Sequence, residues 1–230
     1  DHGMGGAARL AAEAAARCGA GLVSVATRST HVGAMLAARP ELMVHAVDGN
    51  ALPDALLQRA SVLAVGPGLG RDDWGRGLLQ QCLAAGKPLV LDADALNLAA
   101  QEGMRVPTDC VLTPHPGEAA RLLRCGSGEV QRDRFAAAAA LVERLQCTVV
   151  LKGAGTLVAA PGRTPAVIDA GNPGMASGGM GDVLTGVIAA LRAQGLDAFD
   201  AACCGALLHA AAGDLAARDG ERGLLAGDLM

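Results

Sequence analysis

Aromatic residues are scarce in this sequence. Its 230 residues include no tyrosine, two phenylalanines and one tryptophan, and the formal net charge is −4 without a cluster of basic residues. Proteins that bind single-stranded nucleic acid combine a positively charged groove with aromatic side chains on which the bases stack. We therefore expect no nucleic-acid partner for this chain.

Long hydrophobic runs are missing as well. The most apolar stretch, residues 198–217, is interrupted by Asp200, His209 and Asp214, whereas a membrane-spanning helix needs about 20 predominantly apolar residues. Hydrophobic residues still make up 51% of the sequence and charged residues 18%, which is not the composition of a disordered chain. We expect one compact domain over residues 1–230, with no membrane partner.

The sequence also lacks the common metal-binding patterns of cysteine and histidine. Its seven cysteines show no C-x-x-C spacing and its five histidines show no H-E-x-x-H spacing, so we do not expect a structural zinc site. Most of the cysteines lie in apolar segments, which is typical of buried thiols in a reducing compartment. We therefore expect a cytoplasmic protein.

Short apolar segments alternate with helical segments throughout the chain. The predicted strands lie at residues 22–27, 42–47, 61–65, 88–91, 110–113, 148–151, 157–160 and 166–170, the last two as a hairpin. The apolar runs lack polar alternation, which is typical of strands buried on both faces of a parallel sheet. We expect a layered α/β fold with a mainly parallel sheet, flanking helices and an antiparallel hairpin at its edge. Among the helices, residues 131–146 are predicted as one long helix and residues 119–124 as a short one.

Residues 171–182, which we call the glycine loop, form the most informative segment. Five of these twelve residues are glycine, and residues 183–191 that follow have the apolar spacing of a packed helix. Glycine lets the backbone bend tightly and approach a ligand closely. Free N–H groups at a helix N-terminus bind anions, so the loop predicts a phosphate site.

Asp182 ends the glycine loop and has two interpretations. It could be an N-cap, whose side chain accepts a hydrogen bond from the first turn of the helix. It could also be a general base that takes a proton from a substrate hydroxyl beside the bound phosphoryl group. An ordinary N-cap does not require the surrounding glycines, so we favour the general base.

Further candidate residues follow predicted strands, where open α/β sheets bind ligands. Residues 66–70, with the sequence G-P-G-L-G, follow the strand at 61–65. Asp92 and Asp94 follow the strand at 88–91, and we expect one of them to cap the next helix and the other to face the pocket.

Two more strand ends carry His115, Glu118 and Lys152. His115 stands between two prolines, which fix its backbone, and Glu118 opens the next helix, where it either complements the helix dipole or serves the site. Lys152 is one of only two lysines in the chain. It predicts a phosphate or nucleotide contact, with a surface lysine as the alternative.

Six motifs in sequence order resemble one family. They are G-M-G-G-A (3–7), V-G-P-G-L-G (65–70), L-D-A-D-A-L-N (91–97), L-T-P-H-P-G-E (112–118), L-K-G-A-G-T (151–156) and G-N-P-G-M-A-S-G-G-M-G-D-V-L-T-G (171–186). Together they resemble the ADP/ATP-dependent NAD(P)H-hydrate dehydratases, which are repair enzymes of the ribokinase-like superfamily. Each motif alone is weak, but the series covers the whole chain.

The resemblance implies a ribokinase-like three-layer fold and a nucleotide-dependent dehydration. The substrate is NADH or NADPH whose nicotinamide ring has taken up water. ADP or ATP, with Mg²⁺, phosphorylates the ring hydroxyl, and phosphate is then eliminated. Phosphorylation helps because water, the conjugate acid of hydroxide, has a pKa of about 15.7, whereas phosphate has a pKa of roughly 6.

The resemblance also implies features beyond the reaction. Family members are often homotetramers, so we expect a homo-oligomer. An NAD(P)H-hydrate epimerase is expected as a fused or separate partner. The first strand of the family fold is absent from this sequence, so we expect either that it lies upstream of Asp1 or that the sheet edge it would cover is open.

Site residues follow from the resemblance, position by position. Asp182 matches the base, Gly179 and Gly181 belong to the loop that holds the transferred phosphoryl group, and Glu118 matches a residue that organises metal and phosphate. The nucleotide-contacting positions are Lys152, Gly153, Ala154, Gly155, Thr156, Asn172, Pro173, Gly174, Met175, Ala176, Ser177, Gly178, Gly179, Met180 and Gly181. The positions that contact the hydrated dinucleotide are Ala7, Gly68, Gly70, His115, Pro116, Gly117, Glu118, Ala119, Ala120, Arg121 and Asp182.

Two other functions are compatible with the glycine loops. A kinase of the same fold would phosphorylate a small vitamin-precursor alcohol and leave the phosphate on its product. A non-catalytic nucleotide-binding sensor would bind the nucleotide without turnover. The segments at 112–118 and 151–156 favour the dehydratase over the kinase, and the presence of Asp182 argues against the sensor.

Overall fold

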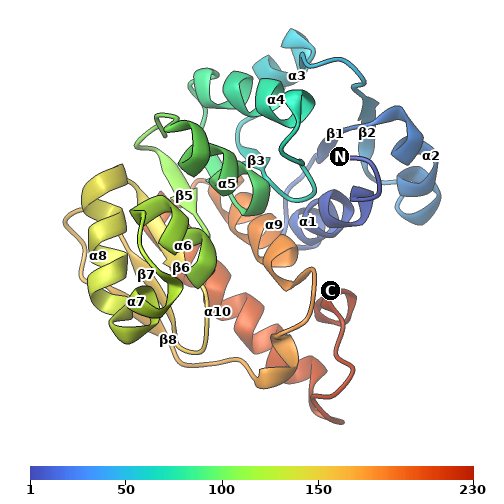
Figure 1. The fold of residues 1–230 in the computed structure, drawn as a ribbon. Coiled ribbons are helices and arrows are strands. Elements are labelled where there is room, and N and C mark those ends of the chain that lie inside the picture. Colours follow the sequence, from blue (N-terminus) through green and yellow to red (C-terminus); the bar gives the residue numbers. More distant parts are fainter.

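The computed structural model describes residues 1–230 as alternating strands and helices (Figure 1). The strands are β1 (Ser24–Thr27), β2 (Met43–Ala46), β3 (Leu63–Val65), β4 (Leu89–Leu91), β5 (Cys110–Leu112), β6 (Thr148–Leu151), β7 (Thr156–Ala159) and β8 (Ala166–Ile168). The helices are α1 (Gly5–Arg17), α2 (Ser29–Ala38), α3 (Asp54–Arg59), α4 (Asp73–Ala84), α5 (Ala93–Glu102), α6 (Pro116–Leu123), α7 (Ser127–Arg132), α8 (Arg134–Leu145), α9 (Met180–Ala193) and α10 (Ala198–Ala216), with 3-10 helices η1 (Pro173–Met175) and η2 (Ala226–Leu229). Every predicted strand is present, with ends that differ by at most two residues.

A six-stranded sheet in the order β3-β4-β5-β6-β7-β8 forms the centre of the fold. The strands β3 to β6 pair in parallel, for example with Leu89 opposite Cys110. The strand β7 is antiparallel to both β6 and β8, and β1 and β2 form a separate parallel pair. The prediction of a mainly parallel sheet with an antiparallel hairpin at its edge is confirmed.

The side chains of the central strands alternate between two apolar cores. Leu89 and Leu91 of β4 belong to a core shared with α4, α5, α6 and α8. Val90 and the central valines of β5, β6 and β7 belong to a second core shared with α9 and α10. A strand buried on both faces needs apolar side chains at every position, which explains the lack of polar alternation in the sequence.

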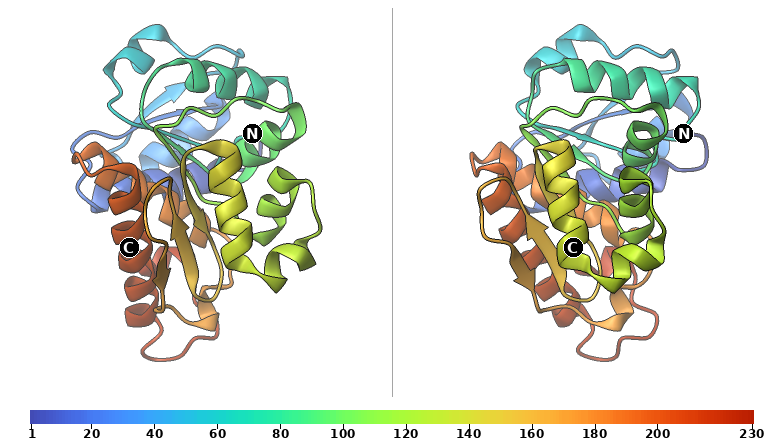
Figure 2. Two further views of the ribbon diagram at one scale, coloured as in Figure 1. Left: turned by 90° about the vertical axis from the view of Figure 1, so that its left-hand side faces the viewer. Right: turned by 60° about the vertical axis from the view of Figure 1, so that its left-hand side comes forward.

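Helices cover both faces of this sheet and produce three layers. Figure 2 shows α8 (yellow) on one side of the sheet and α10 (orange to red) on the other. Helix α9 packs against α10 and α1, and a Cβ atom on Gly186 of α9 would lie 2.0 Å from the carbonyl oxygen of Ala11 on α1. Only glycine permits this approach, so Gly186 sets the distance between the two helices. None of the helices combines the length and the apolar composition that a membrane crossing needs.

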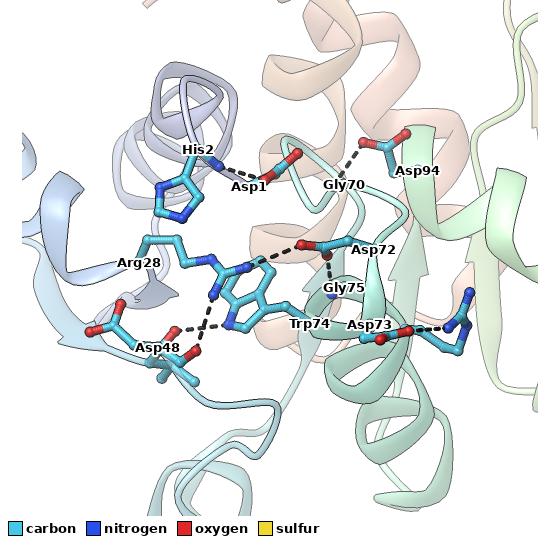
Figure 3. A network of polar contacts seen from close by, with 12 residues as sticks. Asp1, His2, Arg28, Asp48, Gly70, Asp72, Asp73, Trp74, Gly75 and Asp94 are labelled. Carbon is cyan, nitrogen blue, oxygen red and sulfur yellow. Dashed lines mark hydrogen bonds and ion pairs between the residues drawn. The ribbon is translucent and has the colours of Figure 1, made fainter.

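The two sheets do not join. A cavity of about 690 Å³ lies between them, lined mostly by apolar side chains of α1, β1, β3 and α4, and it reaches the loop at residues 66–69. Beside this cavity, Val47, directly after β2, packs in the same apolar core as Trp74. The polar network around Arg28 and Trp74 (Figure 3) makes a second connection. The guanidinium of Arg28 lies 4.2 Å from the centre of the Trp74 ring and bonds the Asp48 carbonyl at 3.0 Å and the Asp72 carboxylate at 3.2 Å. This network fixes the carboxyl ends of β1 and β2 to the start of α4.

Two helix predictions require correction. The helix predicted at residues 131–146 is two helices, α7 and α8, because Asp133 leaves helical geometry and caps α8 by accepting a hydrogen bond from the Ala136 N–H at 2.9 Å. The helix predicted at residues 119–124 begins earlier, at Pro116, because proline suits the first helical turn and His115 caps it.

The candidate residues leave the sheet at one edge. The parallel strands β4, β5 and β6 end there, directly before Asp92, Thr113 and Lys152. Two antiparallel pairings separate β8 from β6, so β8 runs in the same direction as β6 and also ends at this edge. The glycine loop starts three residues after β8. The topology therefore brings the loop, Asp92, Lys152 and the turn at residues 113–118 toward one another.

Candidate active site

The N-terminus of α9 is left uncapped by side chains. The N-cap residue is Gly179, in the left-handed conformation with φ of +91°, and no side chain bonds the first turn. By contrast, Asp133 caps α8 and Asp197 caps α10. The free N–H groups of the first turn carry the positive end of the helix dipole, so this end of α9 has the properties of an anion site.

Asp182 lies in the first turn of α9, three residues after the N-cap. The N-cap interpretation of this residue is therefore wrong, because Gly179 holds that position and Asp182 makes no capping bond. Burial, followed by the nearby charge of Asp92, raises the pKa of Asp182 to about 6, while Lys152 acts in the opposite direction. A carboxylate with a pKa in this range ionises near neutral pH and is basic enough to accept a proton.

A buried ion pair lies behind the glycine loop. The Lys152 ammonium group donates to Asp92 Oδ1 at 2.6 Å, and the hydroxyl of Thr185 on α9 donates to Asp92 Oδ2 at 3.0 Å. Asp92 is only 1% exposed. A buried carboxylate needs such partners, because an unpaired buried charge costs several kcal/mol.

Gly181 packs directly on this ion pair. A Cβ atom at Gly181 would lie 3.1 Å from Lys152 Nζ and 3.3 Å from Asp92 Oδ2. The absence of a side chain at Gly181 thus lets the lysine charge approach the backbone of the first turn. Lys152 is not a solvated surface lysine, because its side chain is 20% exposed and ion-paired.

His115 and Glu118 form a capping box at the start of α6. His115 Nδ1 accepts from the Gly117 N–H at 3.0 Å, and Glu118 Oε2 accepts from the His115 N–H at 2.8 Å. Burial raises the pKa of Glu118 to about 7, against the influence of Lys152. Burial, with Lys152 and Arg121 nearby, lowers the pKa of His115. The two residues are therefore part of the same electrostatic environment as Lys152.

The expectation that Asp92 or Asp94 caps the helix after β4 is wrong for both residues. Asp92 occupies the N-cap position of α5, but its oxygens are taken by Lys152 and Thr185, and it makes no cap bond. Asp94 Oδ2 accepts instead from the Gly70 N–H at 3.0 Å (Figure 3). Ala93 between them has a φ of +46°, which sends the two carboxylates in different directions.

The candidate dinucleotide segments at the N-terminus and at residues 66–70 lie against each other. A Cβ atom at Gly68 would lie 2.4 Å from the Met4 carbonyl oxygen, and one at Gly70 would lie 2.6 Å from the side chain of Asp1. Ala7 is half-buried in the first turns of α1, just after this contact. Arg121 of α6 donates to Asn97 at 2.9 Å, which links α6 to α5.

The glycine loop is covered by the last residues of the chain. The Ser177 hydroxyl donates to the Leu224 carbonyl at 3.0 Å, and a Cβ atom at Gly174 would lie 2.4 Å from the carbonyl oxygen of Glu221. Figure 1 shows this red C-terminal segment folded back toward the start of α9. Residues far apart in the sequence thus shape the loop together.

Two residues near the site, Arg134 and His209, were not predicted from the sequence. The Arg134 guanidinium on α8 donates to the carbonyls of Leu151, at 2.9 Å, and Ala154, and so holds the loop at residues 152–155. The Nε2 atom of His209 on α10 is buried without a hydrogen-bond partner. Burial lowers the pKa of His209 to about 4, although a contact with the Met180 carbonyl acts against this shift. In the sequence His209 appeared only as an interruption of an apolar run.

The predicted metal ligand Glu118 does not belong to a protein-only metal cage. No group of three or more His, Cys, Asp or Glu side chains is arranged to hold a metal ion. In nucleotide-using enzymes, however, Mg²⁺ commonly takes one or two carboxylates together with substrate phosphates and water. The residues present fit that second arrangement, in which the nucleotide brings most of the ligands.

Comparison with known proteins gives a match over the whole chain. Residues 1–230 match the family model described as NAD(P)H-hydrate dehydratase. The chain is 54% identical over 231 residues to the bifunctional NAD(P)H-hydrate repair enzyme Nnr of Escherichia coli K12, covering 100% of this chain and 44% of the relative. It is 42% identical over 237 residues to the ADP-dependent (S)-NAD(P)H-hydrate dehydratase of Neisseria meningitidis, covering 99% of this chain and 79% of the relative. The chain spans about half the length of the bifunctional relatives.

Solved structures share the fold. A ribokinase-like superfamily protein from Enterococcus faecalis has a TM-score of 0.90 at 31% identity, covering 99% of this chain and 81% of its own. The ADP/ATP-dependent NAD(P)H-hydrate dehydratase from Bacillus subtilis, crystallised with ATP and Mg²⁺, has a TM-score of 0.87 at 30% identity, covering 100% of this chain and 85% of its own. The three-layer architecture is therefore ribokinase-like, as predicted.

Proposed function

This chain belongs to the NAD(P)H-hydrate dehydratase family, and on that premise we propose that it dehydrates hydrated NADH or NADPH with the help of a nucleotide. The observation that carries the mechanism is the position of Asp182. Its carboxylate lies in the first turn of an uncapped helix, with a pKa raised to about 6. Beside it, Lys152 is held against Gly181 by Asp92.

The chemistry begins with transfer of a phosphoryl group to the ring hydroxyl. Asp182 accepts the hydroxyl proton while the hydroxyl oxygen attacks phosphorus and the bond from phosphorus to the bridging oxygen of the nucleotide breaks. The N–H groups at the start of α9 and the charge of Lys152 stabilise the negative charge on the phosphoryl oxygens.

Elimination completes the reaction. Phosphate leaves with the electron pair of its bond to the ring carbon. The neighbouring carbon gives up a proton to the departing phosphate, and the electron pair of that C–H bond forms the double bond. The double bond that hydration had removed is restored. The products are NADH or NADPH, inorganic phosphate and the nucleotide with one phosphate fewer. Phosphate is a far better leaving group than hydroxide, by roughly ten pKa units.

We assign the nucleotide to residues 152–156 and the glycine loop, and the hydrated dinucleotide to Ala7, Gly68, Gly70 and residues 115–121. Convergence of these segments at one edge of the sheet supports the assignment. ADP or ATP is the donor, and Mg²⁺, when bound, neutralises charge on the phosphates. Glu118 is the residue we assign to that ion, since its buried carboxyl lies in the same electrostatic environment as Lys152 and Asp92.

We further propose one domain over residues 1–230 that works in the cytoplasm as a homo-oligomer, with a homotetramer as the expected form. The free state of all seven cysteines supports a reducing compartment. An NAD(P)H-hydrate epimerase is the proposed partner, either fused or separate. The bifunctional names of longer relatives support this pairing.

The test is a turnover assay with hydrated NADH, Mg²⁺ and either ADP or ATP, which follows the return of the reduced nicotinamide absorbance. Asp182→Asn should still bind the nucleotide but lose turnover by several orders of magnitude. A near-normal rate in this variant would overturn the assignment of the base. Release of inorganic phosphate separates a dehydratase from a kinase, which leaves phosphate on its product, and binding without turnover would indicate a sensor.

A further inference from the structure

Asp214 on α10 bonds the residues at which the glycine loop begins. Its Oδ2 atom accepts from the Gly171 N–H at 3.0 Å, and its Oδ1 atom accepts from Asn172 Nδ2 at 3.0 Å. Both oxygens of one carboxylate are thus used on two consecutive residues of the loop. Asp214 itself lies outside the residues assigned to either substrate.

Asn172 links Asp214 to the next residues of the loop. Its Oδ1 atom accepts from the Gly174 N–H at 3.0 Å and caps the helix η1. A carboxylate can only accept a hydrogen bond and an N–H group can only donate one. The Asn172 amide therefore has a single orientation that satisfies both Asp214 and Gly174, and Asp214 selects that orientation.

Packing holds the same part of the loop against α10. A Cβ atom at Gly213 would lie 2.3 Å from the Met175 sulfur, and one at Gly171 would lie 3.3 Å from the same atom. Gly171 also needs its φ of +101°, which other residues rarely adopt. The apolar contact through Met175 fixes the distance of the loop from α10, and the Asp214 carboxylate fixes its direction.

We propose that Asp214 is a positioning residue for nucleotide binding. Through Gly171 and Asn172 it holds the start of the glycine loop in the conformation that leads to the open N-terminus of α9. It touches neither substrate and has no role in proton transfer. This inference rests on the proposed function of the loop as the nucleotide site.

The experiment measures ADP and ATP binding calorimetrically with Mg²⁺ and without the hydrated dinucleotide, in the wild type, Asp214→Asn and Asp214→Ala. Asparagine keeps one acceptor oxygen but places an NH₂ group against a donor, and alanine removes both acceptors. Asp214 does not contact the nucleotide, so its loss weakens binding by lowering the share of molecules whose loop is in the binding conformation. One hydrogen bond to a charged group shifts such an equilibrium about tenfold. We expect the nucleotide Kd to rise about tenfold in Asp214→Asn and further in Asp214→Ala.

The matched control is Asp219→Asn, which removes the same charge from an exposed residue shortly after α10. In turnover assays, Asp214→Asn should raise KM for the nucleotide about as much as Kd while kcat and KM for the hydrated dinucleotide change less than twofold. The split between the two KM values is the discriminating readout, because a merely structural role would disturb both substrate sites and kcat together.

The outcomes are separable. If the wild type binds neither ADP nor ATP, the proposed function fails. If the wild type binds nucleotide and Asp214→Asn binds it as tightly as Asp219→Asn does, the positioning role is overturned while the proposed function stands. Equal increases in KM for both substrates would also overturn the positioning role.

Discussion

The ammonium group of Lys152 lies 2.6 Å from the carboxylate of Asp92, and this ion pair forms the wall behind Gly181. The pair joins three elements, since Lys152 follows β6, Asp92 follows β4, and Thr185 of α9 donates to the same carboxylate. One buried interaction therefore supports the fold and places a positive charge beside the first turn of α9.

Asp92→Asn should lower the free energy of unfolding by about 3 kcal/mol, because it leaves the partly buried Lys152 charge without its partner. Denaturant unfolding measures this loss. The control is Asp94→Asn, which weakens the bond to the Gly70 N–H and the exposed ion pair with Arg71, and it should cost about 1 kcal/mol. Equal losses in the two variants would contradict a special role for the buried pair.

The turnover rate should rise with pH through about 6, because Asp182 accepts a proton only when it is ionised and its pKa is raised to about 6. Single-turnover rates measured between roughly pH 5 and 8 show this rise of the rate with pH and its midpoint. Since Asp92 is the second cause of the raised pKa, Asp92→Asn should move the midpoint to lower pH. An unmoved midpoint would mean that Asp182 does not respond to the Asp92 charge.

Asp182→Asn should be more stable than the wild type at pH 8. Folding raises the pKa of Asp182, so its favourable contribution is complete below its unfolded value of about 3.9 and is lost as the pH rises through about 6. At pH 8 the wild type keeps an unfavourable charge that asparagine lacks, worth on the order of 1–3 kcal/mol. Chemical denaturation at a series of pH values should show this advantage shrinking to zero near pH 4. Asp219→Asn should show no comparable trend.

Gly186→Ala should destabilise the fold by about 3 kcal/mol, because its Cβ atom would lie 2.0 Å from the Ala11 carbonyl and force α1 away from α9. Thermal unfolding measures the effect. The matched control is Gly33→Ala in α2, where the new Cβ atom meets nothing within 4 Å. That variant should be more stable than the wild type by about 0.5–1 kcal/mol.

Ala93→Gly should stabilise the fold by about 1 kcal/mol, because Ala93 has a φ of +46° that glycine adopts without steric cost. Denaturant midpoints test this against Ala100→Gly in the same helix. That control should lose about 1 kcal/mol. A loss in both variants would show that Ala93 is not strained.

The sheet could be predicted because its strands are buried on both faces and so have apolar side chains at every position. The break at Asp133 was missed, because residues 131–134 are all polar and no apolar residue marks a change of helix face there. Its one signal is Asp133 itself, a residue type preferred at the N-cap. The sequence predicts that Asp92 lies at the end of a strand, but it does not predict the partners of its carboxylate. Lys152 and Thr185 lie 60 and 93 residues later. The order of the strands brings Lys152 to Asp92, and the packing of α9 on the sheet brings Thr185 there.

The same distinction applies to the glycine loop. Its glycines and following helix predict an anion site from the sequence alone, since both properties are local. The residues that shape it from outside are distant in sequence: Asp214 follows Asn172 by 42 residues and Leu224 follows Ser177 by 47. No local sequence pattern predicts such partners, because each contact depends on how a later helix or segment packs against the loop.

The contact between Ser177 and Leu224 also has a consequence for synthesis in the cell. Strands and helices of the sheet can assemble as the chain emerges from the ribosome, but the loop before α9 gains this support only after Leu224 has left the exit tunnel. The proposed catalytic centre is therefore among the last parts of the protein to mature, and a nascent chain that stalls earlier carries the sheet without the complete glycine loop.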